Sequence, residues 1–90
     1  MITKVSVLTS VTTLDAAKVR RKIVVQNLGT NPVFVAFDGS TDVTTSSGSK
    51  PGVRLDQYET FGWDLDITQT NHAWYAIADG GTSNVSVQYV

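Results

Sequence analysis

The amino-acid sequence predicts an all-β fold, a small antiparallel β-sandwich or β-barrel of six to seven strands. Val, Ile and Thr supply 29 of the 90 residues, and β-branched side chains suit a pleated sheet better than a helix. Good helix formers are scarce, with one Glu, one Met and five Leu. Short segments also alternate apolar and polar side chains, with the period of two that half-buried strands show.

Residues 3–8 form the first predicted strand, because Val5 and Val7 point to one face while Lys4 and Ser6 point to the other. Two arrangements of residues 1–10 remain open. The segment is either an N-terminal arm that pairs with a neighbouring subunit or a strand that pairs within the chain's own sheet.

The next strand covers residues 20–27 and follows a stretch, residues 12–17, that we interpret as an irregular link or a short strand. Its continuous apolar triplet, residues 23–25, favours burial on both faces and a central place in a sheet. Gly, Asn and Pro within residues 27–32 predict a turn. Residues 33–37 then run back and form a predicted hairpin with the strand at 20–27.

The segment 33–37 is apolar on both faces. Val33, Val35 and Phe37 share one face, and Phe34 and Ala36 share the other. Residues 38–52 are polar and rich in Ser, Thr and Gly, with a single isolated Val43. They predict a long surface loop, of a length that is uncommon unless the loop is functional or mobile.

The rest of the chain contains the remaining strands. A short strand is expected over residues 53–55, a long one over 58–67, and two more over 73–78 and 84–90. Gly80 and Gly81 lie between the last two strands, where they predict a tight hairpin turn.

Residues 1–90 form a single domain with a thin core, since a chain of this length buries only about two-thirds of its unfolded surface. Small domains usually gain stability from disulfides, a metal or self-association. The chain has no Cys and one His, which excludes disulfides, zinc-thiolate sites and a histidine-rich metal site within one chain. We expect no cofactor. We therefore expect self-association or docking on a larger partner.

The net charge is −1, from seven basic and eight acidic residues, so no basic face for nucleic acid is expected. No apolar run approaches the roughly 20 residues that span a bilayer. Residues 1–10 lack the apolar core of a signal peptide. We expect no nucleic-acid or membrane partner, and a chain that stays in the cytoplasm or joins a particle assembled there.

Catalytic groups are scarce in the sequence. A Ser-His-Asp triad would need His72, which lies in a polar turn of a chain without a nucleophile elbow, so a solvated turn residue is the better interpretation. Asp64 and Asp66 are two apart and offer carboxylates for Ca²⁺ or a glycosidase pair. Edge carboxylates that keep a strand soluble explain them better. Asp38 and Asp42 are an equally weak candidate calcium loop.

These considerations assign no catalytic, cofactor-binding or metal-binding residue, and we expect that the chain is not an enzyme. The aromatic residues instead suggest binding. Trp63 shares an apolar face with Phe61, which favours core packing over a sugar-stacking platform. Trp74 and Tyr75 point to opposite faces, so one ring should be buried and the other partly exposed as a candidate interface anchor.

The order of the motifs is informative. An arginine-led strand, residues 20–27, ends in Gln26-Asn27, turns through Gly29 and Asn31, and returns as an alternating apolar strand. A loop, the segment Gly52-Val53-Arg54-Leu55 and a polar turn at 56–59 follow, and then a hairpin at 73–82 and a closing strand. Over residues 19–90 this order resembles small virion proteins of tailed phages, although the polar turn keeps only Glu59 of the usual Pro-Gly-Glu.

The resemblance implies a capsid decoration (cement) protein with a β-sandwich or β-barrel fold, made in the host cytoplasm and located on the capsid surface of the virion. Such proteins commonly sit as trimers over junctions between major capsid protein subunits. We therefore expect the major capsid protein and further copies of the chain as partners. The residues that we assign to partner contact are Lys4, Arg20, Arg21, Trp74 and Tyr75.

Two other functions remain open. The alternative is a host-surface or glycan-binding module of a phage fibre or tail, which is motivated by Trp74, Tyr75 and the loop at 38–52. A small hydrolase that uses His72 and Asp64 has the least support.

Overall fold

The computed structural model describes residues 1–64 and 72–90 and confirms the all-β prediction. Within these residues eight strands and no helix are present: β1 (Ile2–Val7), β2 (Thr12–Asp15), β3 (Lys22–Asn27), β4 (Val33–Ala36), β5 (Val53–Leu55), β6 (Thr60–Asp64), β7 (Trp74–Ala78) and β8 (Ser83–Tyr89). The count is eight rather than six to seven, and it includes the strand Thr12–Asp15, which pairs with β7. The predicted extension of β6 to residue 67 lies outside the described residues.

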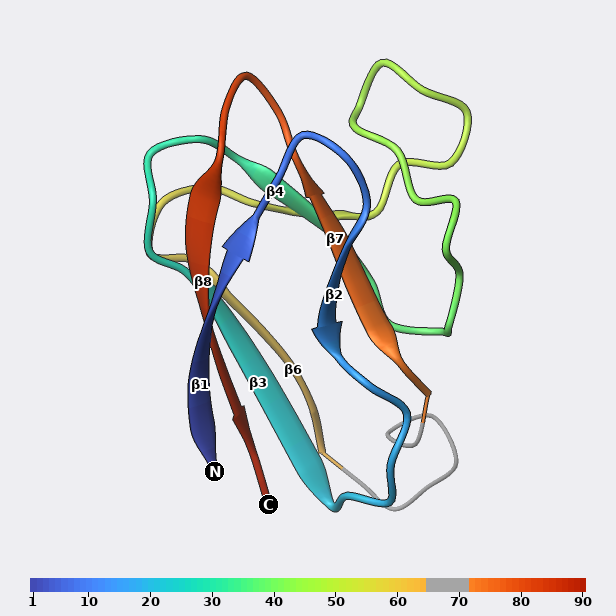
Figure 1. The fold of residues 1–90 in the computed structure, drawn as a ribbon, viewed down its shortest axis with the longest axis vertical. Coiled ribbons are helices and arrows are strands. Elements are labelled where there is room, and N and C mark those ends of the chain that lie inside the picture. The colour runs from blue at the N-terminus through green and yellow to red at the C-terminus, as the bar shows by residue number, and fades with distance from the viewer. Residues whose placement is uncertain (65–71) are drawn as a thin grey trace.

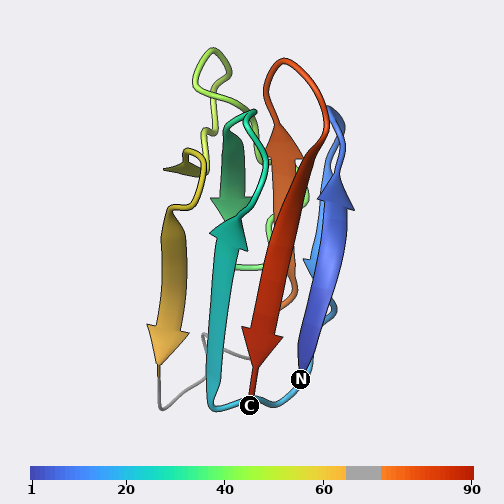
Figure 2. The same ribbon diagram turned by 90° about the vertical axis from the view of Figure 1, so that its left-hand side faces the viewer.

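The strands form two four-stranded sheets that pack face to face (Figure 1). Sheet A has the order β1-β8-β3-β6 and sheet B the order β2-β7-β4-β5, and Figure 2 shows sheet A facing the viewer. The first strand pairs with the last, the second with the seventh, the third with the sixth and the fourth with the fifth, all antiparallel. This is the pairing of one long hairpin rolled into two sheets, which is a jelly roll.

Two predicted hairpins are wrong. β3 and β4 lie in opposite sheets, because β3 pairs with β6 and β8 while β4 pairs with β5 and β7. β7 and β8 also lie in opposite sheets, so residues 79–82 connect the sheets and Gly80 alone of the two glycines has positive φ, +88°. The central place of β3 in its sheet is confirmed.

The core lies between the two sheets and consists of the inward side chains of the alternating strands. Ile23 and Val25 of β3 are fully buried, whereas Val24 between them is only half-buried. Trp74 of β7 is the largest fully buried side chain. Its ring lies 6.0 Å from that of Phe37 and 5.8 Å from that of Phe61, between centroids, at the tilted angles that aromatic pairs prefer.

The loop at residues 38–52 covers part of the outer face of sheet B. Phe34 and Ala36 point away from the core, as their alternation predicts, yet both are buried because Val43 of the loop packs on them. The loop also bonds to itself, since Thr44 N–H donates to the Lys50 carbonyl (2.9 Å). The isolated valine in this polar segment therefore anchors the loop to the sheet.

Asn27, at the end of β3, is fully buried and connects four segments. Its Nδ2 donates to the carbonyl oxygens of Asn31 (2.9 Å) and Leu55 (3.0 Å). Its Oδ1 accepts from the Gly29 N–H (3.0 Å) and from the Ser83 hydroxyl (2.7 Å). Both donors of the amide are used, and the buried oxygen has two partners, as a buried polar group requires.

Replacing Asn27 by Ala should lower the free energy of unfolding by about 3 kcal/mol, because several buried donors and acceptors lose their partners together. Chemical denaturation measures this change. Asn84→Ala is the matched control, since Asn84 is exposed on β8, and it should change stability by less than about 0.5 kcal/mol. Equal losses in the two variants would contradict the role given to Asn27.

Candidate functional site

The residues assigned to partner contact do not form one site. Lys4 is exposed on β1 in sheet A, and Arg21 is exposed just before β3. Tyr75 lies half-buried against the cluster on the outer face of sheet B. Arg20 and Trp74 are buried within the chain. The structure therefore leaves three of the five residues at the surface, on separate parts of it.

The buried member of the aromatic pair is Trp74, with 0% exposure, while Tyr75 is partly exposed. This confirms that the two neighbouring rings face opposite ways. It also corrects the assignment of Trp74 to partner contact, because its ring is enclosed by the core and a partner on the surface cannot reach it. Tyr75 stays a candidate.

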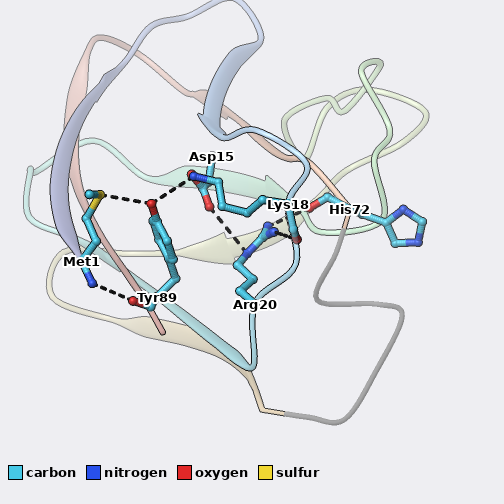
Figure 3. A network of polar contacts seen from close by, with 6 residues as sticks. All are labelled: Met1, Asp15, Lys18, Arg20, His72 and Tyr89. Carbon is cyan, nitrogen blue, oxygen red and sulfur yellow. Dashed lines mark hydrogen bonds and ion pairs between the residues drawn. The ribbon is translucent and has the colours of Figure 1, made fainter.

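Arg20 is likewise enclosed, which corrects its assignment to partner contact (Figure 3). Its side chain donates to the Lys18 carbonyl through Nη1 (3.0 Å) and to the His72 carbonyl through Nη2 (2.7 Å). Its Nε lies 3.5 Å from Oδ2 of Asp15. Burial lowers the pKa of the Arg20 guanidinium, and the Asp15 carboxylate opposes that shift. Arg20 thus ties the link before β3 to the segment before β7.

The polar contacts around Asp15 extend to the start of β1 and the end of β8. Lys18 Nζ donates to the Tyr89 hydroxyl (3.0 Å) and lies 3.1 Å from Oδ1 of Asp15. These two contacts raise the pKa of Lys18, the bond to Tyr89 first. The Tyr89 hydroxyl in turn donates to Sδ of Met1 (3.1 Å), and the Met1 ammonium donates to the Tyr89 carbonyl (2.7 Å). We name these six residues the terminal cluster: Met1, Asp15, Lys18, Arg20, His72 and Tyr89 (Figure 3).

A pocket of about 390 Å³ lies between the loop at 38–52 and strands β4 and β5. We call it the loop pocket. Asp38, Ser40 and Asp42 form part of its polar side, and residues of β4, of β5 and of the loop itself, Val43 among them, line the rest. The Lys50 ammonium binds Asp42 and lowers the pKa of its carboxyl. Hydrogen bonds from Ser40 lower the pKa of Asp38. Ionised acceptors beside an apolar wall can hold a small polar molecule.

A second hollow, of about 380 Å³, crosses the outer face of sheet A. All four strands contribute to it, with Val24 and Gln26 from β3, Ser86 and Gln88 from β8, Thr60 from β6 and Ile2 from β1. Hydroxyl and amide groups alternate with apolar groups on this face. We call it the sheet A groove.

The other predicted chemical groups are separated. Within residues 1–64 and 72–90, no three His, Asp or Glu side chains are placed to hold a metal ion. His72 is exposed, and its backbone rather than its ring has the bond to Arg20. Asp66 and the side chain of Asp64 lie outside what the structure describes.

In the part of the chain that is described, no helix has the length and apolarity needed to cross a membrane. Comparison of the chain with protein-family models, with curated protein sequences and with solved structures found no match.

The candidate sites are the loop pocket and the sheet A groove, and both are suited to binding.

Sequence reasoning did not identify either hollow. The isolated apolar Val43 is the signal for the loop pocket, since one valine in a polar loop suggests an anchor. The sheet A groove has a weaker signal, because Ser86 and Gln88 share a face with the period of two. That Ile2 belongs beside Gln88 follows only from the pairing of the first strand with the last.

Replacing Lys50 by Met should raise the pKa of the Asp42 carboxyl toward its ordinary value, because the ammonium group that stabilises the ionised form is lost. NMR titration of the Asp42 side-chain carbon measures the change. In the native chain this pKa is depressed. The ion pair therefore stabilises the loop above the unfolded pKa of Asp42, and this stabilisation is lost as pH falls through the folded pKa.

Arg54→Met is the control for this titration, since Arg54 binds Asp56 and not Asp42. An equal rise of the Asp42 pKa in this variant would show that the Lys50 contact is not its cause.

Proposed function

We propose that this chain is a structural protein of a phage virion that decorates and stabilises the capsid by binding subunits of the major capsid protein. The observation that carries the proposal is the jelly-roll pairing of the eight strands, because this architecture recurs in viral capsid domains. A fold alone does not fix a function. The motif order in residues 19–90 gives the proposal independent support.

The size of the domain supports the same role. A 90-residue chain buries little core, so contacts with neighbours add stability that the chain lacks by itself. A shell offers the same contact many times, and repeated weak contacts reach high avidity. We include self-association, with a trimer favoured, and a place on the outer capsid surface after synthesis in the host cytoplasm. The role is one of binding, without catalysis and without nucleic-acid or membrane partners.

The purified protein should co-sediment with shells assembled from the major capsid protein of the same genome. Quantitative mass spectrometry of virions should find it in many copies, and sedimentation equilibrium should show an oligomer. A chain that stays monomeric at high concentration and fails to bind the shells would contradict the proposal.

A second candidate function is a glycan-binding module of a phage fibre or tail. The observation that favours it is the loop pocket, where Asp38 and Asp42 present ionised acceptors to a space of about 390 Å³. Jelly rolls are also found among lectin domains, and carboxylates are strong acceptors for the hydroxyl groups of a sugar.

On a glycan array, the native chain should then bind a defined set of sugars and the Asp38→Ala variant should lose most of that binding, since it lacks one acceptor in the pocket. Asp79→Ala is the control, because Asp79 is exposed in the turn after β7. A blank array for the native chain would count against this second function.

A further inference from the structure

We infer that the outer face of sheet A is the docking face of this protein and that it binds an acidic protein surface. The inference rests on the proposed function and deepens it, since the acidic surface is then part of the capsid shell. Four features support it: the bare sheet, the composition of its rows, the distribution of charge and the exposed apolar side chains at its edge.

The two sheets differ in what covers them. The loop at 38–52 covers part of the outer face of sheet B, where Val43 packs on Phe34 and Ala36. Sheet A has no such cover from the described residues, and its outer face is seen unobstructed in Figure 2. An open sheet face on a small domain is the natural place for a partner, because burial there extends a thin core.

The strand register places eight side-chain positions of this face in two rows. One row runs Ile2, Gln88, Val24 and Gly62 from β1 to β6. The next runs Lys4, Ser86, Gln26 and Thr60. Gly62 and Ser86 are the smallest members, and Ser86 lines the groove. Such a shallow, broad surface of short polar and aliphatic groups fits a protein surface better than it fits a compact small molecule.

Charge is unevenly distributed along the chain and in space. Residues 1–37 contain five basic and one acidic side chain, whereas residues 38–90 contain two basic and seven acidic ones. Lys4 and Lys22 are exposed on the outer face of sheet A, and Arg21, which is also exposed, directly precedes Lys22. The two charged side chains that the structure describes on this face are therefore both basic. Complementary charge selects an acidic partner.

Exposed apolar side chains adjoin the lysines. Ile2 is 70% exposed and Val90 is 77% exposed, and both line the sheet A groove. They lie near the chain ends, which Figure 1 shows side by side. A protein interface typically buries such groups within a polar surround. A second copy docked face to face is disfavoured, because the charged side chains described on both faces would be basic.

The test compares two docking-face variants with matched controls, using shells of the major capsid protein. Lys4→Glu/Lys22→Glu reverses the charge of the face, and Lys50→Glu/Arg54→Glu makes the same total change on the loop and β5. Ser86→Trp fills the middle of the groove, and Thr13→Trp adds the same ring at an exposed position of β2. Circular dichroism and thermal melts first confirm that each variant is folded.

Both docking-face variants should bind the shells at least about tenfold more weakly than the native chain, and both controls within about twofold. The binding of the native chain should also weaken as salt rises. If the native chain binds the shells and all four variants bind equally well, the docking face is overturned while the proposed function stands. A native chain that does not bind overturns both.

Two further outcomes would also overturn this assignment. If the shell is the partner, Ser86→Trp leaves the sedimentation of the free protein unchanged. An oligomer that dissociates in this variant would therefore make the face a contact between copies. Sugar binding that Ser86→Trp abolishes would make it a glycan site.

Discussion

Asn27 joins the two sheets at the end of the sandwich opposite the chain ends, and the placement of several strands depends on it. Its side chain bonds to the turn after β3, to the end of β5 and to the start of β8. Its backbone carbonyl accepts from the Tyr58 N–H (2.6 Å). A different position of these segments around Asn27 would leave buried donors or acceptors without partners in an apolar interior. Strands distant in sequence are thus fixed around one amide.

The terminal cluster joins the two sheets at the end of the sandwich where the chain ends lie, and it does so with charged groups. The side chain of Arg20 has no exposed surface, so the carbonyl oxygens and the Asp15 carboxylate must compensate for the loss of water. Its partners come from the link before β3 and from the segment before β7, while Lys18 extends the cluster to Tyr89 of β8. The arginine that leads the third strand is therefore a structural residue.

Between these two ends the sandwich has unequal outer faces, and this asymmetry bears on function. The loop at 38–52 occupies sheet B through Val43 and creates a pocket at its margin. Sheet A keeps short polar side chains on an open surface. A surface that the chain covers itself cannot also receive a broad partner. The two candidate functions consequently draw on different places: a shell contact on sheet A, and a small sugar beside the loop.

Composition and alternation alone determined the fold class, most of the strands and the grouping of Val33 and Val35 apart from Phe34 and Ala36, because these are local properties of an extended chain. Tertiary structure decided which strands pair. Ile2 lies opposite Gln88, and no local pattern records a contact across that distance. It also decided that Trp74 rather than Tyr75 faces the core, since alternation separates two neighbouring rings without saying which side the second sheet will cover.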